Sequence, residues 1–319
     1  MGSLDAEQIA GIPRDEALAL VDELLGRPEE WPSELVSYRL RSDFQSFWKA
    51  ELGRWLNTAK THGYHQKLAE LAVKKARRPT RSVGRDPNDR RYLDLVQTLA
   101  EGMVDHYLTS TGWTFLCWNH QELVPQGTDC VKQKYDSDLV LHVAGTDVSI
   151  QVKAPDQFGT VVNGRLYDGE NDDRVLRAIE KARDQLPRHR AGVIGVSAIR
   201  RWSLASEPDC VVVDLIGSVT GRDGGYFLDR PGKFFTPEWA HVSAVLLLHL
   251  TIGGCLDEVE DAAVYNCTVL LNPQAKFPLG GRAFPHASVL SLGEETSTWI
   301  GGEPTGAHSI PQGTKLTTP

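Results

Sequence analysis

Residues 135–155 read YDSDLVLHVAGTDVSIQVKAP, and this stretch decides how the chain is expected to fold. Two apolar runs, SDLVLHV (137–143) and VSIQVKA (148–154), flank the short sequence AGTD (144–147). The lengths of the runs and the small or polar residues between them are typical of a β-hairpin with a tight turn. We therefore expect two antiparallel strands here, joined at 144–147.

Polar side chains gather at one end of this predicted hairpin. Because alternate residues of a strand face the same side, Gln151 and Lys153 share one face. The turn brings the start of the first run opposite the end of the second, so we expect Asp138 to lie beside both of them. A carboxylate, an amide oxygen and an ammonium group then meet at one edge of an otherwise apolar sheet.

These groups suit a hard divalent cation such as Mg²⁺, which takes oxygen ligands from carboxylates, carbonyls, water and a substrate phosphate. The predicted ligands are the side-chain oxygens of Asp138 and Gln151 and the backbone carbonyl of Val152. Lys153 is then placed to hold an attacking water and to stabilise the charge that develops on a phosphate. Asp136 shares the face of Asp138 and is an alternative ligand.

Each of these residues also has a purely structural interpretation. The aspartates fit the solvated end of a strand or a turn, and Lys153 fits the exposed surface of an edge strand. An unpaired lysine in a sheet covered by helices is costly, however, and this cost favours a partner for Lys153.

The rest of the chain supplies helices and further strands around the hairpin. Helical spacing of apolar residues predicts helices at 14–25, 66–78, 91–113 and 173–186, and Gly112 is expected to end the third of them. Strand composition marks 113–118 as a buried strand and also indicates strands at 192–198, 209–217, 243–252 and 264–271, of which 243–252 is also compatible with a helix. This order predicts an α/β fold, with a mixed central β-sheet flanked by helices.

The predicted domain organisation follows from the same pass along the chain. We expect an N-terminal helical domain at 1–78, a basic linker at 79–91 and an α/β domain at 92–291. The residues from 292 to 319 are rich in Ser, Thr, Gly and Pro, and we expect a disordered tail there.

Charge is distributed unevenly along the 319 residues. The net charge is −8, yet residues 49–91 hold 12 Lys or Arg against 4 Asp or Glu, so this segment carries +8 and the remainder −16. Such a segment is a candidate footprint for nucleic acid, and its most basic part holds Lys74, Lys75, Arg77 and Arg78. The alternative is a solvated helix face followed by a basic linker.

Targeting signals and cysteine chemistry narrow the class of protein. The sequence lacks the apolar stretch of roughly 18 residues that a membrane span needs, and its first residues lack the pattern of a signal peptide, so we expect a cytoplasmic protein without a membrane partner. The five cysteines are scattered without a C-x-x-C pair, which argues against a disulfide framework and a cysteine-based zinc site.

An aspartate that opens one strand, followed after a short turn by (D/E/Q)-x-K on the next, resembles the PD-(D/E)XK, or restriction-endonuclease-like, nuclease superfamily. Here the matching residues are Asp138 and Gln151-Val152-Lys153, a Q-x-K form similar to that of Mrr-type restriction enzymes and of the endonuclease subunit of some heteromeric transposases. The resemblance covers roughly residues 92–200. It implies a restriction-endonuclease-like core in which these residues, together with Glu101, form the active centre.

Glu101 enters through a second part of the resemblance. The helix before the motif usually carries a glutamate about eleven residues before a glycine that leads into an aromatic strand residue, and Glu101 stands eleven residues before Gly112-Trp113. On that match Glu101 binds the metal or its water. The helix after the motif often carries basic and amide groups that contact the nucleic-acid backbone, and Arg177, Lys181 and Gln185 match this description.

The resemblance implies a Mg²⁺-dependent endonuclease that hydrolyses DNA phosphodiester bonds, with Mn²⁺ as a substitute, in bacterial phage defence or mobile-element biology. Cutting both strands of a duplex then requires a homodimer or a partner subunit. Glutamine in place of the second acidic ligand removes one formal charge from the site. Two alternatives stay open: a catalytically inactive nuclease fold that binds DNA or serves in assembly, and a nuclease for RNA or structured junctions.

Overall fold

The predicted hairpin forms one side of a mixed sheet whose strand order is β1-β11-β10-β7-β4-β3-β2, with β12 beside β11. Strands β4, β7 and β10 are parallel neighbours, and the other pairs along this order are antiparallel. The strands are β1 (Gly2–Asp5), β2 (Thr114–Gln126), β3 (Val131–Val143), β4 (Thr146–Lys153), β7 (Ala191–Arg200), β10 (Val242–Cys255), β11 (Glu258–Leu271) and β12 (Ser288–Leu290).

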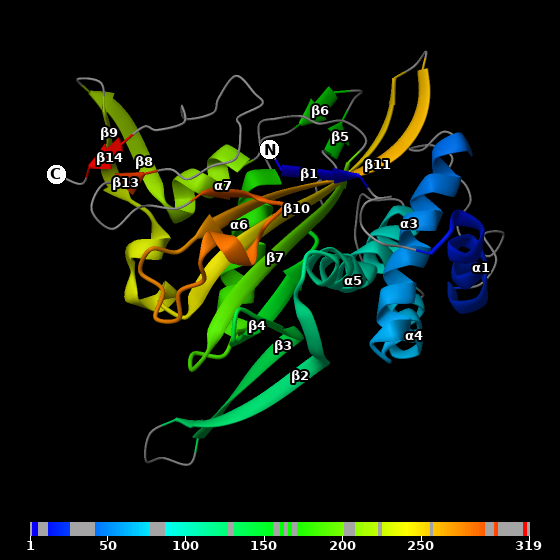
Figure 1. Ribbon diagram of the computed structural model, residues 1–319, viewed down its shortest axis with the longest axis horizontal. Coiled ribbons are helices and arrows are strands. Elements are labelled where there is room, and N and C mark those ends of the chain that lie inside the picture. Colours follow the sequence, from blue (N-terminus) through cyan, green and yellow to red (C-terminus); the bar gives the residue numbers. More distant parts are fainter. Residues whose placement is uncertain are drawn as a thin grey trace.

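This computed structural model describes residues 2–5, 12–25, 42–76, 87–126, 131–155, 160–162, 165–167, 171–200, 208–222, 225–255, 258–290, 297–298 and 315–317. Within them the fold class is α/β, with a mixed sheet flanked by helices as predicted (Figure 1).

The hairpin turn is tighter than the sequence indicated. Ala144 and Gly145 have φ values of 49° and 80°, and Val143 pairs directly with Thr146. Two central residues with positive φ define a two-residue turn whose twist matches that of the flanking strands. The resulting register pairs Leu139 with Ile150, so each predicted face of the hairpin is confirmed.

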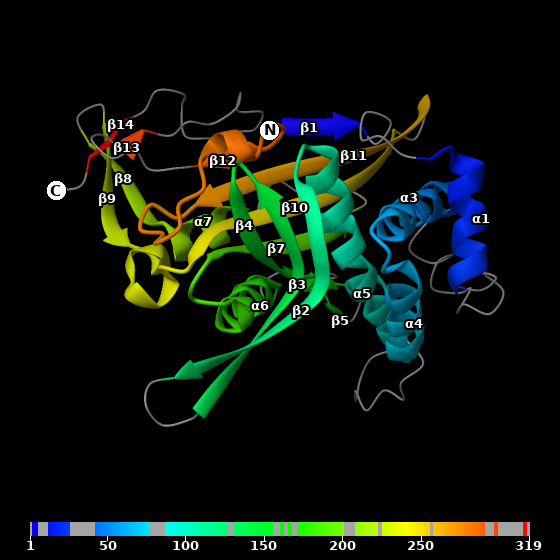
Figure 2. The ribbon, with the colours of Figure 1, turned by 60° about the horizontal axis from the view of Figure 1, so that its bottom comes forward.

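Helices cover both faces of the sheet in two layers (Figures 1 and 2). On one face lies α5 (Pro87–Ser110), which packs against α3 (Ser42–Thr61) and α4 (His65–Ala76), with α1 (Arg14–Leu25) outside α3. On the other face lie α6 (Asn171–Gln185) and α7 (Pro208–Leu215). The sheet is therefore buried from both sides through most of its area.

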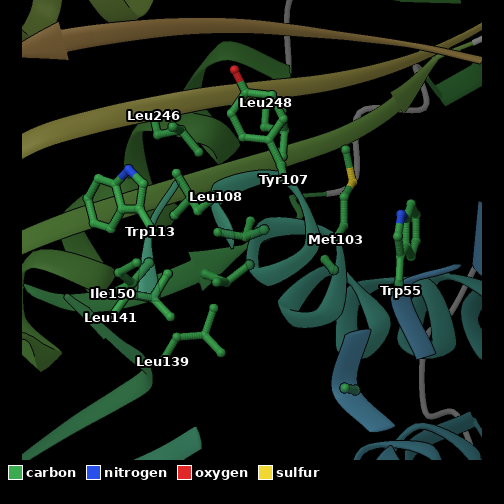
Figure 3. Close-up of a cluster of buried hydrophobic side chains, with 14 of the residues drawn as sticks. Trp55, Met103, Tyr107, Leu108, Trp113, Leu139, Leu141, Ile150, Leu246 and Leu248 are labelled. Atoms are coloured by element: carbon green, nitrogen blue, oxygen red, sulfur yellow. The ribbon is translucent and has the colours of Figure 1, made fainter. Parts of the chain in front are cut away.

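The larger hydrophobic core joins the N-terminal helices to the sheet. Trp55 of α3 and Met103 of α5 lie in the same buried cluster as Leu139, Ile150 and Leu248 of the sheet (Figure 3). The residues predicted as a separate N-terminal helical domain thus share one core with the sheet, and β1 adds residues 2–5 to the sheet itself. Of the predicted linker, residues 87–91 form the first turn of α5, and 79–86 lie outside the described residues.

Helix α5 ends where the sequence predicts. Gly112 has a φ of +102°, and the N–H of Trp113 donates to the carbonyl of Leu108 at 3.1 Å. A glycine with positive φ just past the last helical turn reverses the chain and satisfies the final carbonyl groups. Strand β2 therefore starts at once, at Thr114.

Two strand predictions need correction. The segment 113–118 was expected as a buried strand, but β2 is an edge strand, and Leu116 is 46% exposed. The segment 209–217 was expected as a strand, but residues 208–215 form α7. Pro208 suits the first turn of a helix, and Val211 and Leu215, four residues apart, bury one helical face against α6. The segment 243–252, left open between strand and helix, lies in β10.

Smaller elements surround this core. They are β5 (Thr160–Val162), β6 (Arg165–Tyr167), β8 (Gly217–Arg222), β9 (Gly225–Pro231), η2 (Lys233–Phe235), η3 (Pro237–Trp239), η4 (Gly281–Ala283), β13 (Ser297–Thr298) and β14 (Lys315–Thr317). The last two fall in the predicted tail and join β8 and β9 in a small sheet, and the other residues of 292–319 lie outside the described residues. Across the described helices, none has the length and apolar character that a bilayer crossing requires.

Candidate functional site

Asp138 lies where strand β3 separates from strand β4. Pairing between β3 and β4 ends at Leu139 and Ile150, and beyond that point β3 continues with β2 as a two-stranded ribbon that projects past the end of β4 (Figures 1 and 2). On the β2 side the register passes from Trp118 to His120, and the intervening Asn119 has a φ of +52°. Asn119 stands opposite Asp138 in this register. Ladder pairing is thus interrupted on both sides of Asp138.

The carboxylate of Asp138 fills the opening between β3 and β4. Its Oδ2 accepts a hydrogen bond from the backbone N–H of Val152 at 2.7 Å. The N–H and C=O of one strand residue point toward the same neighbouring strand, so the carbonyl of Val152 also points into this opening. The carboxylate of Asp138 and the main-chain carbonyl of Val152 therefore approach the same space.

Gln151 and Lys153 are joined directly. The Lys153 ammonium donates to Gln151 Oε1 at 2.7 Å, while Gln151 Nε2 donates to the backbone carbonyl of Asp136 at 2.8 Å. The carbonyl and the ammonium together determine which way the amide points, because one requires a donor and the other an acceptor. Gln151 is 1% exposed and Lys153 is half-buried, so the amide is held by its surroundings and the ammonium remains near the surface.

Asp136 contributes its backbone to this group. Its carboxylate lies 3.4 Å from the ammonium of Lys134 on the same strand. Its carbonyl orients Gln151, and its Oδ1 is buried without a hydrogen-bond partner among the described residues, so Asp136 stays the alternative ligand beside Asp138.

Glu101 reaches this end of the sheet from α5. The C-terminal end of α5 leads into Thr114, which pairs with His142 beside the hairpin turn, so earlier residues of α5 lie toward the end of β4. One turn after Glu101, the side chain of Val104 packs over Gly195, the β7 partner of Val152. Glu101 is thus at the level of the proposed ligands.

The contact that holds Glu101 was not predicted from the sequence. Its Oε2 accepts a hydrogen bond from the indole N–H of Trp118 on β2 at 2.7 Å. The neighbouring β3 residue in register with Trp118 is Leu139, which directly follows Asp138. The sequence placed Trp118 in an aromatic strand, but no spacing rule connects it with a carboxylate seventeen residues earlier.

The faces of the sheet separate Glu101 from the Q-x-K pair. The β7 partners of Gln151 and Lys153 are Ile194 and Val196, which pack in the cluster on the α6 side, whereas Glu101 belongs to α5 on the other side. Asp138 lies between them, since its carboxylate is bonded within the plane of the strands.

The predicted nucleic-acid contacts fall on both layers of helices. Arg177 and Lys181 are exposed on α6, one turn apart, but Gln185 of the same helix is half-buried with its Oε1 turned inward. Lys74 is exposed near the end of α4, on the opposite layer. Lys75 lies in α4, but its side chain is outside the described part of the structure. Arg77 and Arg78 lie outside the described residues altogether.

The ligands predicted from the sequence are all oxygen donors: the carboxylates of Asp138 and Glu101, the amide oxygen of Gln151 and the carbonyl of Val152. Glu101 comes from α5, on the face of the sheet opposite Gln151. Oxygen donors of this kind suit Mg²⁺ and are poor ligands for soft metals. Across the described residues, those around Asp138 included, no three His, Cys, Asp or Glu side chains are grouped to bind a metal ion.

Comparison with known proteins adds no relative: no family model, curated protein or solved structure matches the chain. The function of this α/β protein therefore has to be inferred from the geometry around Asp138.

Proposed function

We propose that this protein is a metal-dependent nuclease of the PD-(D/E)XK type that hydrolyses phosphodiester bonds in DNA. The observation that carries the proposal is the meeting of Asp138, Val152, Gln151 and Lys153 where β3 separates from β4. The order α5-β2-β3-β4-β5-β6-α6 supports it, since the superfamily places one helix before its motif strands and another after them.

The chain's own groups have distinct parts in this proposal. Asp138, Gln151 and the carbonyl of Val152 hold the cation, and Glu101 adds a carboxylate from α5 that binds the cation or its water. Lys153 supplies a positive charge beside the phosphate, where negative charge increases as the leaving 3′-oxygen departs. The exposed cations Arg177 and Lys181 of α6 contact the DNA backbone.

The donor chemistry fits Mg²⁺, because each proposed ligand is an oxygen atom and one of them carries a full charge within the opening. When bound, the ion supplies an activated water and stabilises charge on the phosphate. The opening lies at the carboxyl end of β4, beside the middle of β7, and ligands of open α/β sheets bind outside the carboxyl ends of strands.

The test is cleavage of a supercoiled plasmid in the presence of Mg²⁺ or Mn²⁺, compared between the natural protein and Lys153→Met. We expect the natural protein to cut, and we expect the substitution to reduce the rate about 100-fold or more, the usual loss when one group that stabilises the transition state is removed. EDTA should abolish cutting by both proteins.

Lys276→Met is the matched control. Lys276 is an exposed lysine, and its backbone N–H donates a hydrogen bond to the carbonyl of Ala240. Ala240 lies beside the start of β10, at the end of the sheet away from Lys153. The Lys276→Met variant should cleave at the rate of the natural protein. Equal cleavage by Lys153→Met and Lys276→Met, or cleavage that persists in EDTA, would remove the proposal.

One contact favours a second candidate, a nuclease fold that binds DNA without cutting it. The Lys153 ammonium already occupies Gln151 Oε1, the oxygen that the cation needs, and glutamine brings no charge to displace it. This candidate predicts DNA binding that weakens steeply with salt, with no cleavage. Calorimetric titration with Mn²⁺ separates the two, because only the enzyme should show binding that is lost in Asp138→Ala.

A further inference from the structure

Trp118 belongs to a stack of rings that links β2 to the N-terminal helices. The rings of Trp118 and Tyr64 are parallel within 9°, with centroids 5.2 Å apart, and Tyr64 also stacks on Phe115 at 5.5 Å. His62 also stacks on Phe115, with the ring centroids 4.2 Å apart and the planes within 3°. The indole is thus one member of a four-ring column that runs between the α3–α4 junction and β2.

Hydrogen bonds fix this column on α5. Tyr64 is 4% exposed, and its hydroxyl donates to Asp105 Oδ2 at 2.6 Å, while His62 Nδ1 lies 2.8 Å from the same oxygen. Burial, together with the neighbouring Asp105 carboxylate, raises the pKa of Tyr64 well above its ordinary value, so its hydroxyl remains a donor. The column therefore has little freedom to rotate or slide.

Two carboxylates on one side of α5 bind to two adjacent rings of the column. Asp105 receives the Tyr64 hydroxyl, and Glu101, four residues and about one turn earlier, receives the Trp118 indole N–H. Asp105 is fully buried, whereas Glu101 is half-buried at the end of the sheet where Asp138 lies. The same scaffold thus holds one fully buried carboxylate and one half-buried carboxylate.

We propose that Trp118 is a positioning residue for Glu101, and that the Tyr64–Trp118 stack makes the α3–α4 junction part of the active-centre framework. The inference depends on the proposed function, because it assigns a task to the Glu101 carboxylate. The indole N–H bond to Oε2 restrains the orientation of that carboxylate.

The test uses Trp118→Phe, which keeps an aromatic ring against Tyr64 and removes the N–H. We expect the Mg²⁺ concentration for half-maximal cleavage to rise about 10-fold or more, the effect seen when a partner of a metal-binding carboxylate is lost. A purely structural defect leaves this Mg²⁺ requirement unchanged.

Trp113→Phe is the matched control. The Trp113 indole N–H donates to the backbone carbonyl of Ala283 at 2.7 Å, so this variant also loses one buried indole bond, but beyond the C-terminal end of α5. We expect lower stability with an unchanged Mg²⁺ requirement. If Trp118→Phe does not fold, benzothienylalanine at position 118 keeps both rings and lacks the N–H.

A double-substitution cycle with Glu101→Gln separates positioning from other effects. If Trp118 acts through Glu101, Trp118→Phe should produce no additional shift in Mg²⁺ requirement in the Glu101→Gln background. An unchanged Mg²⁺ requirement in Trp118→Phe, while Lys153→Met is inactive, overturns the inference and leaves the proposed function standing. Absence of divalent-cation-dependent cleavage in the natural protein removes both.

Discussion

Asp138→Asn gives the sharpest test of the candidate centre, because it changes one charge and preserves the shape of the side chain. Asparagine keeps a carbonyl oxygen at the position of Oδ2, so it still accepts the Val152 N–H that Asp138 accepts at 2.7 Å. The substitution therefore removes the anion from the opening between β3 and β4 without leaving a backbone donor unpaired.

The expected magnitudes differ sharply between stability and activity. A hydrogen bond to a charged acceptor contributes about 1.5–3 kcal/mol and one to a neutral acceptor about 0.5–1.5 kcal/mol, so the free energy of unfolding should fall by only about 1 kcal/mol. Loss of an outer-sphere partner of a metal costs about 10–100-fold in affinity or activity. Loss of the charged ligand itself should therefore reduce cleavage by about 100-fold or more.

The assay combines plasmid cleavage in Mg²⁺, calorimetric titration with Mn²⁺ and urea-induced unfolding on the same preparations. Asp147→Asn is the control, since Asp147 lies at the other end of β4, is 56% exposed and pairs with His142. This control should match the natural protein in cleavage and Mn²⁺ binding. Asp138→Asn that is folded and cuts at the natural rate would refute the assignment of Asp138 as a metal ligand.

Three further predictions concern the fold. Leu141→Ala should lower the free energy of unfolding by about 3 kcal/mol in urea titrations, because Leu141 is 0% exposed, whereas Leu123→Ala, at a residue 62% exposed, should change it by less than about 0.5 kcal/mol. Gly112→Ala should cost about 1–2 kcal/mol, since its φ is +102°, and Gly280→Ala, at a φ of −81° with open space around it, should be nearly neutral. Burial lowers the pKa of His106 to about 3, so the folded protein keeps it neutral, and stability should fall by about 1.4 kcal/mol per pH unit as the pH decreases from about 6.5 toward 3. Unfolding curves across that range should lose this slope in His106→Gln.

The sequence by itself determined the hairpin and the neighbours within it. Alternation of side chains and a turn of small residues are local properties, and together they specify that Asp138 lies beside Gln151 and Lys153. The end of α5 at Gly112 was predictable for the same reason, because the requirement for positive φ concerns one residue. The α/β class followed from the order of such local elements.

Only the tertiary structure decided which groups from distant segments meet. Residues 208–215 are rich in valine and suit a strand in isolation, yet burial of Val211 and Leu215 against α6 selects a helix. The bond from Trp118 to Glu101, and the stack that joins Trp118 to Tyr64, depend on how α4 and β2 pack on α5. Such contacts come from side-chain packing in a shared core, and that packing cannot be predicted from the spacing of residues along the sequence.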